Sequence, residues 1–145
     1  MQAFDFDNTI YKGESAFDFA LFVMRKKISL IRYLPHILSL LYKYEKCKMS
    51  SEEFQNAFNS YADVLLKNKE IVEDLVVKFW QKNEHKLYPH ILEKIKPEDF
   101  IITASPDFLI EPIKNKINTK NFLCSEADLS LGKITYLNFG ENKVK

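Results

Sequence analysis

The spacing of apolar and polar residues divides the chain into a long helical middle and two mixed end segments. Residues 1–6 are mostly apolar and end at an acidic turn, which predicts a short buried strand. Residues 16–86 contain no glycine and a single proline, and apolar residues recur there at helical spacing. We therefore expect four consecutive helices in this middle segment.

Local signals mark where these helices begin. Ser50 and Glu53 have the spacing of a capping box for the third helix, and Asn68 is suited to cap the fourth. Pro35 stands near the start of the second helix, where proline is tolerated. The apolar faces predicted for the first, second and fourth helices are Phe17, Ala20, Leu21 and Met24; Leu30, Leu34, Leu38 and Leu41; and Ile71, Leu75, Val76 and Phe79.

Short helices and strands alternate after residue 87. The pattern predicts a helix over residues 89–95, a buried strand over 100–103 and a further strand over 122–125, followed by a hairpin arm at 134–139. Ser105 is suited to cap a helix that has Pro106 at its first position and Asp107 at its positive end. The predicted fold class is α/β with an all-helical insertion.

Composition narrows the class of protein. The formal charge is +1, from 21 basic and 20 acidic residues, so the chain lacks the excess positive charge expected of a nucleic-acid-binding protein. The two cysteines belong to no C-x-x-C pair, which gives no support to a disulfide framework or a zinc site. The acidic first residues do not resemble a signal peptide, and the longest uncharged run is about half a membrane span. We expect a cytoplasmic protein without a transmembrane segment or a nucleic-acid partner.

Two polar clusters, DFDNT and TASPD, directly follow predicted strands. Ligands of open α/β sheets bind beyond the carboxyl ends of the strands, so the two clusters meet if their strands are neighbours. Asp5 and Asp7 do not start an EF-hand loop, because that loop needs glycine at the position of Ile10 and an acid at the position of Ala16. An Asx-type turn, in which Asp7 bonds to backbone N–H groups, remains the purely structural alternative.

The same residues suit phosphoryl transfer. One carboxylate can attack phosphorus, a second can carry the proton, and Mg²⁺ can offset the crowded negative charge. Thr103, with the backbone N–H groups of Ala104 and Ser105 behind it, can hold phosphate oxygens at a helix start. Lys143, in the run GENK, can supply positive charge near the nucleophile.

In order along the chain, FDFDNT, IIT and GENK resemble the first three motifs of the haloacid dehalogenase-like (HAD) hydrolase superfamily. The resemblance is greatest to the branch of phosphoserine phosphatases and related small-molecule phosphatases, and it implies a Rossmann-like parallel sheet core with an inserted helical cap. By position, it makes Asp5 the nucleophile, Asp7 the general acid/base, Thr103 the phosphate-binding hydroxyl and Lys143 the lysine of the third motif. It also implies Mg²⁺ held by Asp5 and the backbone carbonyl of Asp7.

The residues that would select a substrate are less defined. Glu14 lies five positions after Thr9, where the phosphoserine phosphatase branch has a glutamate that contacts the substrate amine. Capping of the first helix by Glu14 or Ser15 is the equal alternative. Ser105 stands where that branch commonly has glycine, so the resemblance does not name the substrate.

A basic stretch in the helical middle holds both arginines, Arg25 and Arg32, together with five lysines. These residues could bind a substrate anion or anionic lipid, but such charges more often form a solvated surface.

The resemblance also divides the chain, with residues 1–14 and 87–145 as the core and 15–86 as the cap. The acidic fourth motif that it requires does not occur before residue 145, so we expect a core that is incomplete at the C-terminus and a fragment that is inactive alone. The function expected of the intact protein is magnesium-dependent hydrolysis of a small phosphorylated metabolite through an aspartyl-phosphate. The alternative is a catalytically inactive phosphate-binding or interaction module of the same fold.

Overall fold

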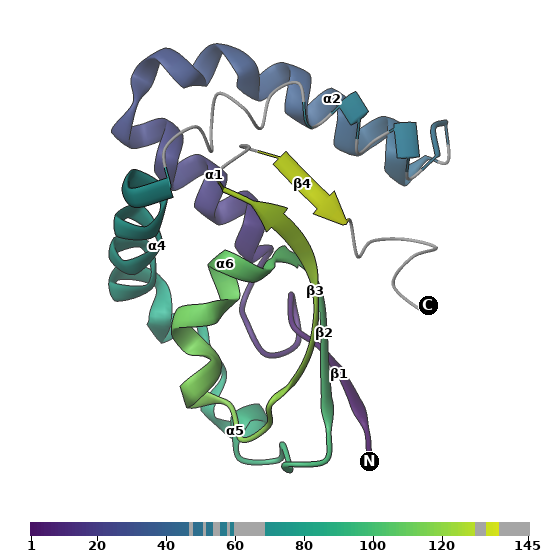
Figure 1. The fold of residues 1–145 in the computed structure, drawn as a ribbon, viewed down its shortest axis with the longest axis vertical. Helices are drawn as coiled ribbons and strands as arrows, with labels where there is room; N and C mark the ends of the chain where they lie inside the picture. The colour runs from purple at the N-terminus through teal and green to yellow at the C-terminus, as the bar shows by residue number, and fades with distance from the viewer. Residues whose placement is uncertain are drawn as a thin grey trace.

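The computed structural model describes residues 1–46, 48–50, 52–53, 56–57, 59, 69–129 and 133–136. Its strands form one sheet in the order β1-β2-β3-β4 (Figure 1). Strands β1, β2 and β3 are parallel, and β4 pairs with β3 as the antiparallel arm of a hairpin. The predicted α/β class and mostly parallel sheet are confirmed. The strands are β1 (Ala3–Asp5), β2 (Phe100–Pro106), β3 (Asn121–Asp128) and β4 (Lys133–Tyr136).

Helices occupy one side of the sheet in Figure 1, and α2 lies across one end of the molecule. The α-helices are α1 (Ser15–Lys26), α2 (Leu34–Glu45), α4 (Lys69–Asn83), α5 (Pro89–Leu92) and α6 (Asp107–Ile110). The 3-10 helices are η1 (Ile28–Tyr33), η2 (Glu84–Lys86) and η3 (Glu111–Lys116). Within the described ranges, no helix is both long and apolar enough to cross a bilayer.

Two of the predicted helix-start signals, at Pro35 and at Ser50 with Glu53, agree with the structure. Pro35 is the second residue of α2, where its missing N–H removes no helical hydrogen bond. The capping box forms, because Ser50 N donates to Glu53 Oε2 at 3.0 Å and Glu53 N donates to Ser50 Oγ at 3.2 Å. Asn68 and most of the predicted third helix lie outside the described residues.

The predicted helix faces are partly wrong. Helix α1 buries Phe19, Phe22 and Val23 together with Met24, while Phe17 is only partly buried. On α4, Val76 and Phe79 are buried as predicted, but Ile71 is 44% exposed and its neighbour Val72 is buried instead. On α2, the predicted Leu38 is 45% exposed and its neighbour Ile37 is buried. Each helix has two apolar stripes at helical spacing, so the period alone does not say which stripe meets the sheet.

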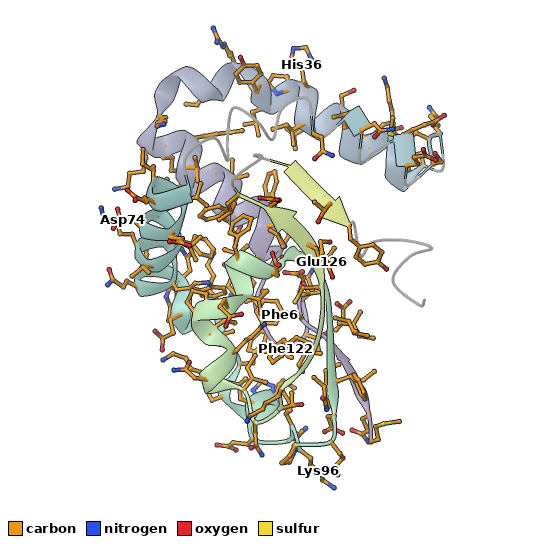
Figure 2. The ribbon with its side chains drawn as sticks, in the orientation of Figure 1. Phe6, His36, Asp74, Lys96, Phe122 and Glu126 are labelled. Carbon is orange, nitrogen blue, oxygen red and sulfur yellow. The ribbon has the colours of Figure 1, made fainter. Side chains whose placement is uncertain are left out.

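An aromatic cluster joins helices α1 and α4 to the residues that follow β1, and Figure 2 labels one of its members, Phe6. Trp80 of α4 meets Phe6 and Tyr11 edge-on, with ring centroids 6.4 and 5.6 Å apart, and Phe79 lies 5.5 Å from Phe19. Trp80 Nε1 donates to the carbonyl oxygen of Leu109 at 2.6 Å, which connects α4 to α6. One hydrophobic core therefore includes α1, α4 and the sheet.

The residues just before the helical middle of the chain pair with the residues at its end. Tyr11 and Leu87 form an antiparallel bridge, Lys12 N donates to the carbonyl of Lys86 at 2.9 Å, and Tyr88 N donates to the carbonyl of Ile10 at 2.8 Å. The two chain segments that flank the helical middle thus lie side by side.

The predictions after residue 87 were less accurate at the boundaries. Helix α5 ends at Leu92 rather than at residue 95, and the hairpin arm is confirmed at 133–136, with 137–139 outside the described residues. The prediction that Ser105 caps a helix is wrong, because β2 continues to Pro106 and the helix starts at Asp107 without a side-chain cap. Ser105 instead donates its N–H to Thr103 Oγ1 at 3.0 Å within β2.

Candidate active site

The loop after β1 is folded tightly enough to bring α1 back to the strand end. The carbonyl oxygen of Phe6 accepts N–H bonds from Ile10 and Tyr11, both at 2.9 Å. Asn8 has φ 61° and Gly13 has φ 111°, conformations that asparagine and glycine tolerate better than other residues. Asn8 N donates to the carbonyl of Gly13 at 3.0 Å. The loop therefore returns the start of α1 to the side chain of Asp7.

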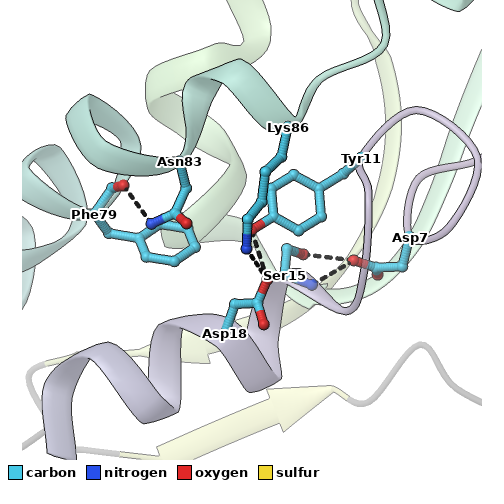
Figure 3. A network of polar contacts seen from close by, with 7 residues as sticks. All are labelled: Asp7, Tyr11, Ser15, Asp18, Phe79, Asn83 and Lys86. Atoms are coloured by element: carbon cyan, nitrogen blue, oxygen red, sulfur yellow. Dashed lines mark hydrogen bonds and ion pairs between the residues drawn. The ribbon is translucent and has the colours of Figure 1, made fainter. Parts of the chain in front are cut away.

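Asp7 lies at the centre of a polar network (Figure 3). Its Oδ1 accepts hydrogen bonds from Ser15 N and Ser15 Oγ, both at 2.7 Å, and its Oδ2 accepts one from Thr103 Oγ1 at 3.1 Å. Ser15 is the first residue of α1, so the carboxylate also faces the positive end of a helix dipole. The structure thus brings two predicted site residues, Asp7 and Thr103, together from strands that are parallel neighbours.

The network continues inside the protein through two hydroxyls. Ser15 Oγ lies 2.5 Å from Ser105 Oγ, and Ser15, Thr103 and Ser105 are all fully or almost fully buried. Thr103 Oγ1 accepts from Ser105 N while it donates to Asp7. The hydroxyl proton of Thr103 is therefore directed at the carboxylate, and the N–H of Ser105 is directed at Thr103.

Burial raises the pKa of Asp7 above its ordinary value of 3.8. The hydrogen bonds from Ser15 and Thr103 oppose this shift, and the nearby negative charge of Asp5 adds to it. Because of this shift, the carboxyl group of Asp7 holds its proton at higher pH than an exposed aspartate does. This property suits a group that donates and accepts a proton.

Asp5 occupies a different environment. It is the last residue of β1, it is exposed, and its Cα pairs with that of Ile102 on β2. Its neighbour Phe6 is fully buried in the core, which fixes the backbone on which both aspartates stand. Asp5 thus faces solvent at the strand end, while Asp7 is held by the protein.

Glu14 occupies the N-cap position of α1 without a side-chain capping bond. Its Oε1 accepts instead from Asn8 Nδ2 at 2.7 Å, so Glu14 lies against the loop that holds Asp7. The capping interpretation is wrong for Glu14, and Ser15 bonds Asp7 rather than capping the helix through its side chain. The substrate-binding role of Glu14 stays a prediction.

Three residues beside the site were missed in the sequence. Asp18 Oδ2 accepts from Tyr11 OH at 2.7 Å and from Lys86 Nζ at 3.1 Å, and Lys86 lies over the Tyr11 ring at 5.8 Å (Figure 3). Burial and the carboxylate of Asp18 raise the pKa of Tyr11, so this hydroxyl stays protonated. The seven-residue spacing of Tyr11 and Asp18 gave no recognisable signal, and Lys86 is brought close by the pairing of residues 86–88 with residues 10–12.

The remaining predicted site residues are only partly described. Lys143 lies outside the described residues. Ala104 is partly buried in β2, and its carbonyl accepts from Ser125 Oγ at 2.7 Å. Within the described part of the chain, no cluster of three or more acidic, histidine or cysteine side chains could hold a metal ion. Asp5 and the backbone of Asp7 nevertheless supply oxygen donors, the chemistry that Mg²⁺ prefers.

Comparison with known proteins identifies the family. The model of the haloacid dehalogenase-like hydrolases matches residues 3–145, and the chain belongs to this family. None of the curated proteins matches the chain. A crystal structure of a protein of unknown function from Bordetella pertussis Tohama I has the same fold, with a TM-score of 0.75 and 16% sequence identity. That similarity covers 99% of this chain and 70% of the other.

Proposed function

We propose that the intact protein is a phosphatase that hydrolyses a small phosphorylated metabolite through an aspartyl-phosphate. The observation that carries this proposal is the hydrogen bond from Thr103 Oγ1 to Asp7 Oδ2, 3.1 Å long, beside the exposed Asp5 at the end of β1. Membership of a hydrolase family supports the reaction class. In this proposal residues 15–86 form the cap, and residues 1–14 and 87–145 form the core.

Asp5 is the proposed nucleophile because its carboxylate is exposed at the strand end. One of its oxygens bonds to phosphorus as the bond between phosphorus and the leaving oxygen breaks, and the proton of Asp7 passes to that leaving oxygen. In the second step a water gives its proton to Asp7 and its oxygen to phosphorus. The acyl-phosphate bond breaks, inorganic phosphate leaves and Asp5 is regenerated.

Thr103 and Glu14 would contact substrate in this scheme. A phosphate oxygen would accept the hydroxyl proton that Thr103 now directs to Asp7, and this exchange would leave Asp7 with one donor fewer. Glu14, exposed beside the loop, would face the rest of the substrate.

Asp5 and the backbone carbonyl of Asp7 would hold Mg²⁺, which supplies positive charge to the phosphoryl oxygens when bound. Both Asp7 carboxylate oxygens already accept hydrogen bonds, which leaves that side chain to proton transfer. Chelation of divalent ions should abolish turnover, and added Mg²⁺ should restore it.

The decisive test is the change Asp5→Asn in the intact protein, which keeps the shape and removes the attacking charge. We expect phosphomonoester turnover to fall by about a thousandfold or more and the burst of released leaving-group alcohol to vanish, with an unchanged circular dichroism spectrum. Asp74→Asn, on the exposed face of α4, is the matched control and should leave turnover unchanged. Turnover of Asp5→Asn within about tenfold of wild type would exclude Asp5 as the nucleophile. Phosphate binding without turnover in the wild type would instead support an inactive binding module.

A further inference from the structure

Positive charge is concentrated in one segment of this nearly neutral chain. Residues 25–48 contain seven of the 21 lysines and arginines but only one of the 20 aspartates and glutamates. This segment comprises the end of α1, η1 and α2, so the excess charge belongs to the end of the molecule that α2 crosses in Figure 1. The remainder of the chain is net acidic, which gives the molecule a charge asymmetry.

Large apolar side chains are exposed in the same segment. Ile31 and Leu38 are each 45% exposed, and Tyr42 is 54% exposed. Leu38 and Tyr42 are one helical turn apart on α2, while Ile37 is buried against the core. Figure 2 shows His36, on the first turn of α2, pointing away from the body of the molecule. Helix α2 therefore exposes large apolar side chains as well as basic ones.

Basic side chains lie close to two tyrosine rings of this segment, the exposed Tyr42 and the partly buried Tyr33. Lys46 Nζ and Lys48 Nζ lie 5.9 and 5.7 Å from the ring centroid of Tyr42, and Arg32 lies 5.0 Å from that of Tyr33. Lys46, Lys48 and Arg32 are exposed. We use the name α2 basic face for the exposed residues in and next to α2: Ile31 and Arg32 of η1, Leu38 and Tyr42 of α2, and Lys46 and Lys48 after its end.

We propose that the α2 basic face docks the protein on the surface of an anionic lipid bilayer. Lysine and arginine would meet the headgroups, Tyr42 would lie at the headgroup level, and Ile31 and Leu38 would enter the acyl boundary. A nucleic acid would match the positive charge equally well, but it would gain nothing from the exposed aliphatic groups. Helix α2 has 12 residues and is too short to span a bilayer of about 30 Å, so it would lie in the plane of the surface.

The proposal is independent of catalysis and is tested by sedimentation with vesicles. The intact protein should sediment with vesicles of equal parts phosphatidylglycerol and phosphatidylcholine, and not with vesicles of phosphatidylcholine alone, and added salt should release it. The double change Lys46→Gln with Lys48→Gln should weaken binding by about thirtyfold. Its control, Lys78→Gln with Lys82→Gln, removes the same charge from the exposed face of α4 and should have little effect.

A second pair of variants tests the apolar contribution. Leu38→Ser with Tyr42→Ser should weaken vesicle binding by about tenfold or more. Ile71→Ser with Val77→Ser changes side chains that are 44% and 49% exposed on α4, and should leave binding unchanged. Circular dichroism verifies that each variant is folded. Absence of binding to the anionic vesicles, equal loss in test and control pairs, or binding of polyuridine RNA in preference to vesicles would each overturn the proposal.

Discussion

The side chain of Asp7 is subject to opposing influences, since burial raises its pKa and three hydrogen bonds lower it, with burial dominant. A carboxyl whose pKa is higher in the folded than in the unfolded state stabilises the fold while it is protonated. This contribution is lost as the pH rises from 3.8 through the higher folded-state pKa. Asp7→Asn should therefore increase the free energy of unfolding at neutral pH, and the increase should shrink as the pH falls towards 3.8. Urea titrations across this range measure it, with Asp74→Asn as the exposed control. A gain that did not depend on pH would contradict this origin.

Ser15 gives a second prediction at the scale of one residue. Ser15→Ala removes one of the two donors to Asp7 Oδ1 and leaves the backbone N–H in place, so the pKa of Asp7 should rise further. Carbon NMR of the labelled aspartate carboxyls follows this titration directly. Ser105→Ala, which removes a buried hydroxyl that contacts Ser15 but not Asp7, is the matched control and should shift the titration less.

The sequence predicted the proximity of Asp7 and Thr103 better than it predicted their other hydrogen-bond partners. Asp7 and Thr103 were expected to meet because each follows a strand, and parallel pairing of β1 with β2 brings them together. Ser15 was expected only as a cap. Its bond to Asp7 depends on the positive φ angles at Asn8 and Gly13, and a sequence pattern does not specify such a loop.

At the scale of elements, the contact of Asp18 with Tyr11 and Lys86 connects α1 to both segments that flank the helical middle. Asp18→Ala would leave the buried Tyr11 hydroxyl and Lys86 without this acceptor, and we expect it to lower the free energy of unfolding by about 2 kcal/mol. Asp74→Ala, which breaks the exposed pair with Lys78, should cost at most about 0.5 kcal/mol. Equal losses in the two variants, measured by urea titration, would argue against a connecting role.

The elements themselves were largely predictable, and their orientation was not. Helical period and the position of Pro35 were sufficient to predict α1, α2 and α4, while most of the predicted third helix lies outside the described residues. Which stripe of α1 is buried depends on Phe79 and Phe108, which pack against Phe19. Those partners come from distant parts of the chain, so burial of Phe19 in place of Phe17 was not accessible to a local pattern.

At the scale of the whole molecule, β1 pairs with one strand, β2, within the described part of the chain. Asp99 secures the start of both strands, because its oxygens accept from Gln2 N at 2.7 Å and from Lys96 N at 2.8 Å. The bond from Lys96, followed by that from Gln2, lowers the pKa of Asp99 below 3.8 despite its burial.

Asp99 should therefore contribute to stability with the opposite pH dependence to Asp7. A carboxyl whose pKa is lower in the folded state stabilises the fold above 3.8, and this contribution is lost as the pH falls through the folded-state pKa. Asp99→Asn should lower the free energy of unfolding at neutral pH, and the deficit should diminish in acid. Amide hydrogen exchange of residues 3–6 should be faster in the variant. Unchanged exchange there would show that Asp99 does not secure β1.

Trp80 is the only tryptophan of the chain, and its indole meets Phe6, the residue between the two site aspartates. Its emission therefore originates from one known place, directly beneath the end of β1. Movement of this strand end when an ion or phosphate binds would change the intensity or wavelength of a single fluorophore, with no background from other indoles. The native chain thus contains an intrinsic optical reporter for titrating its own site.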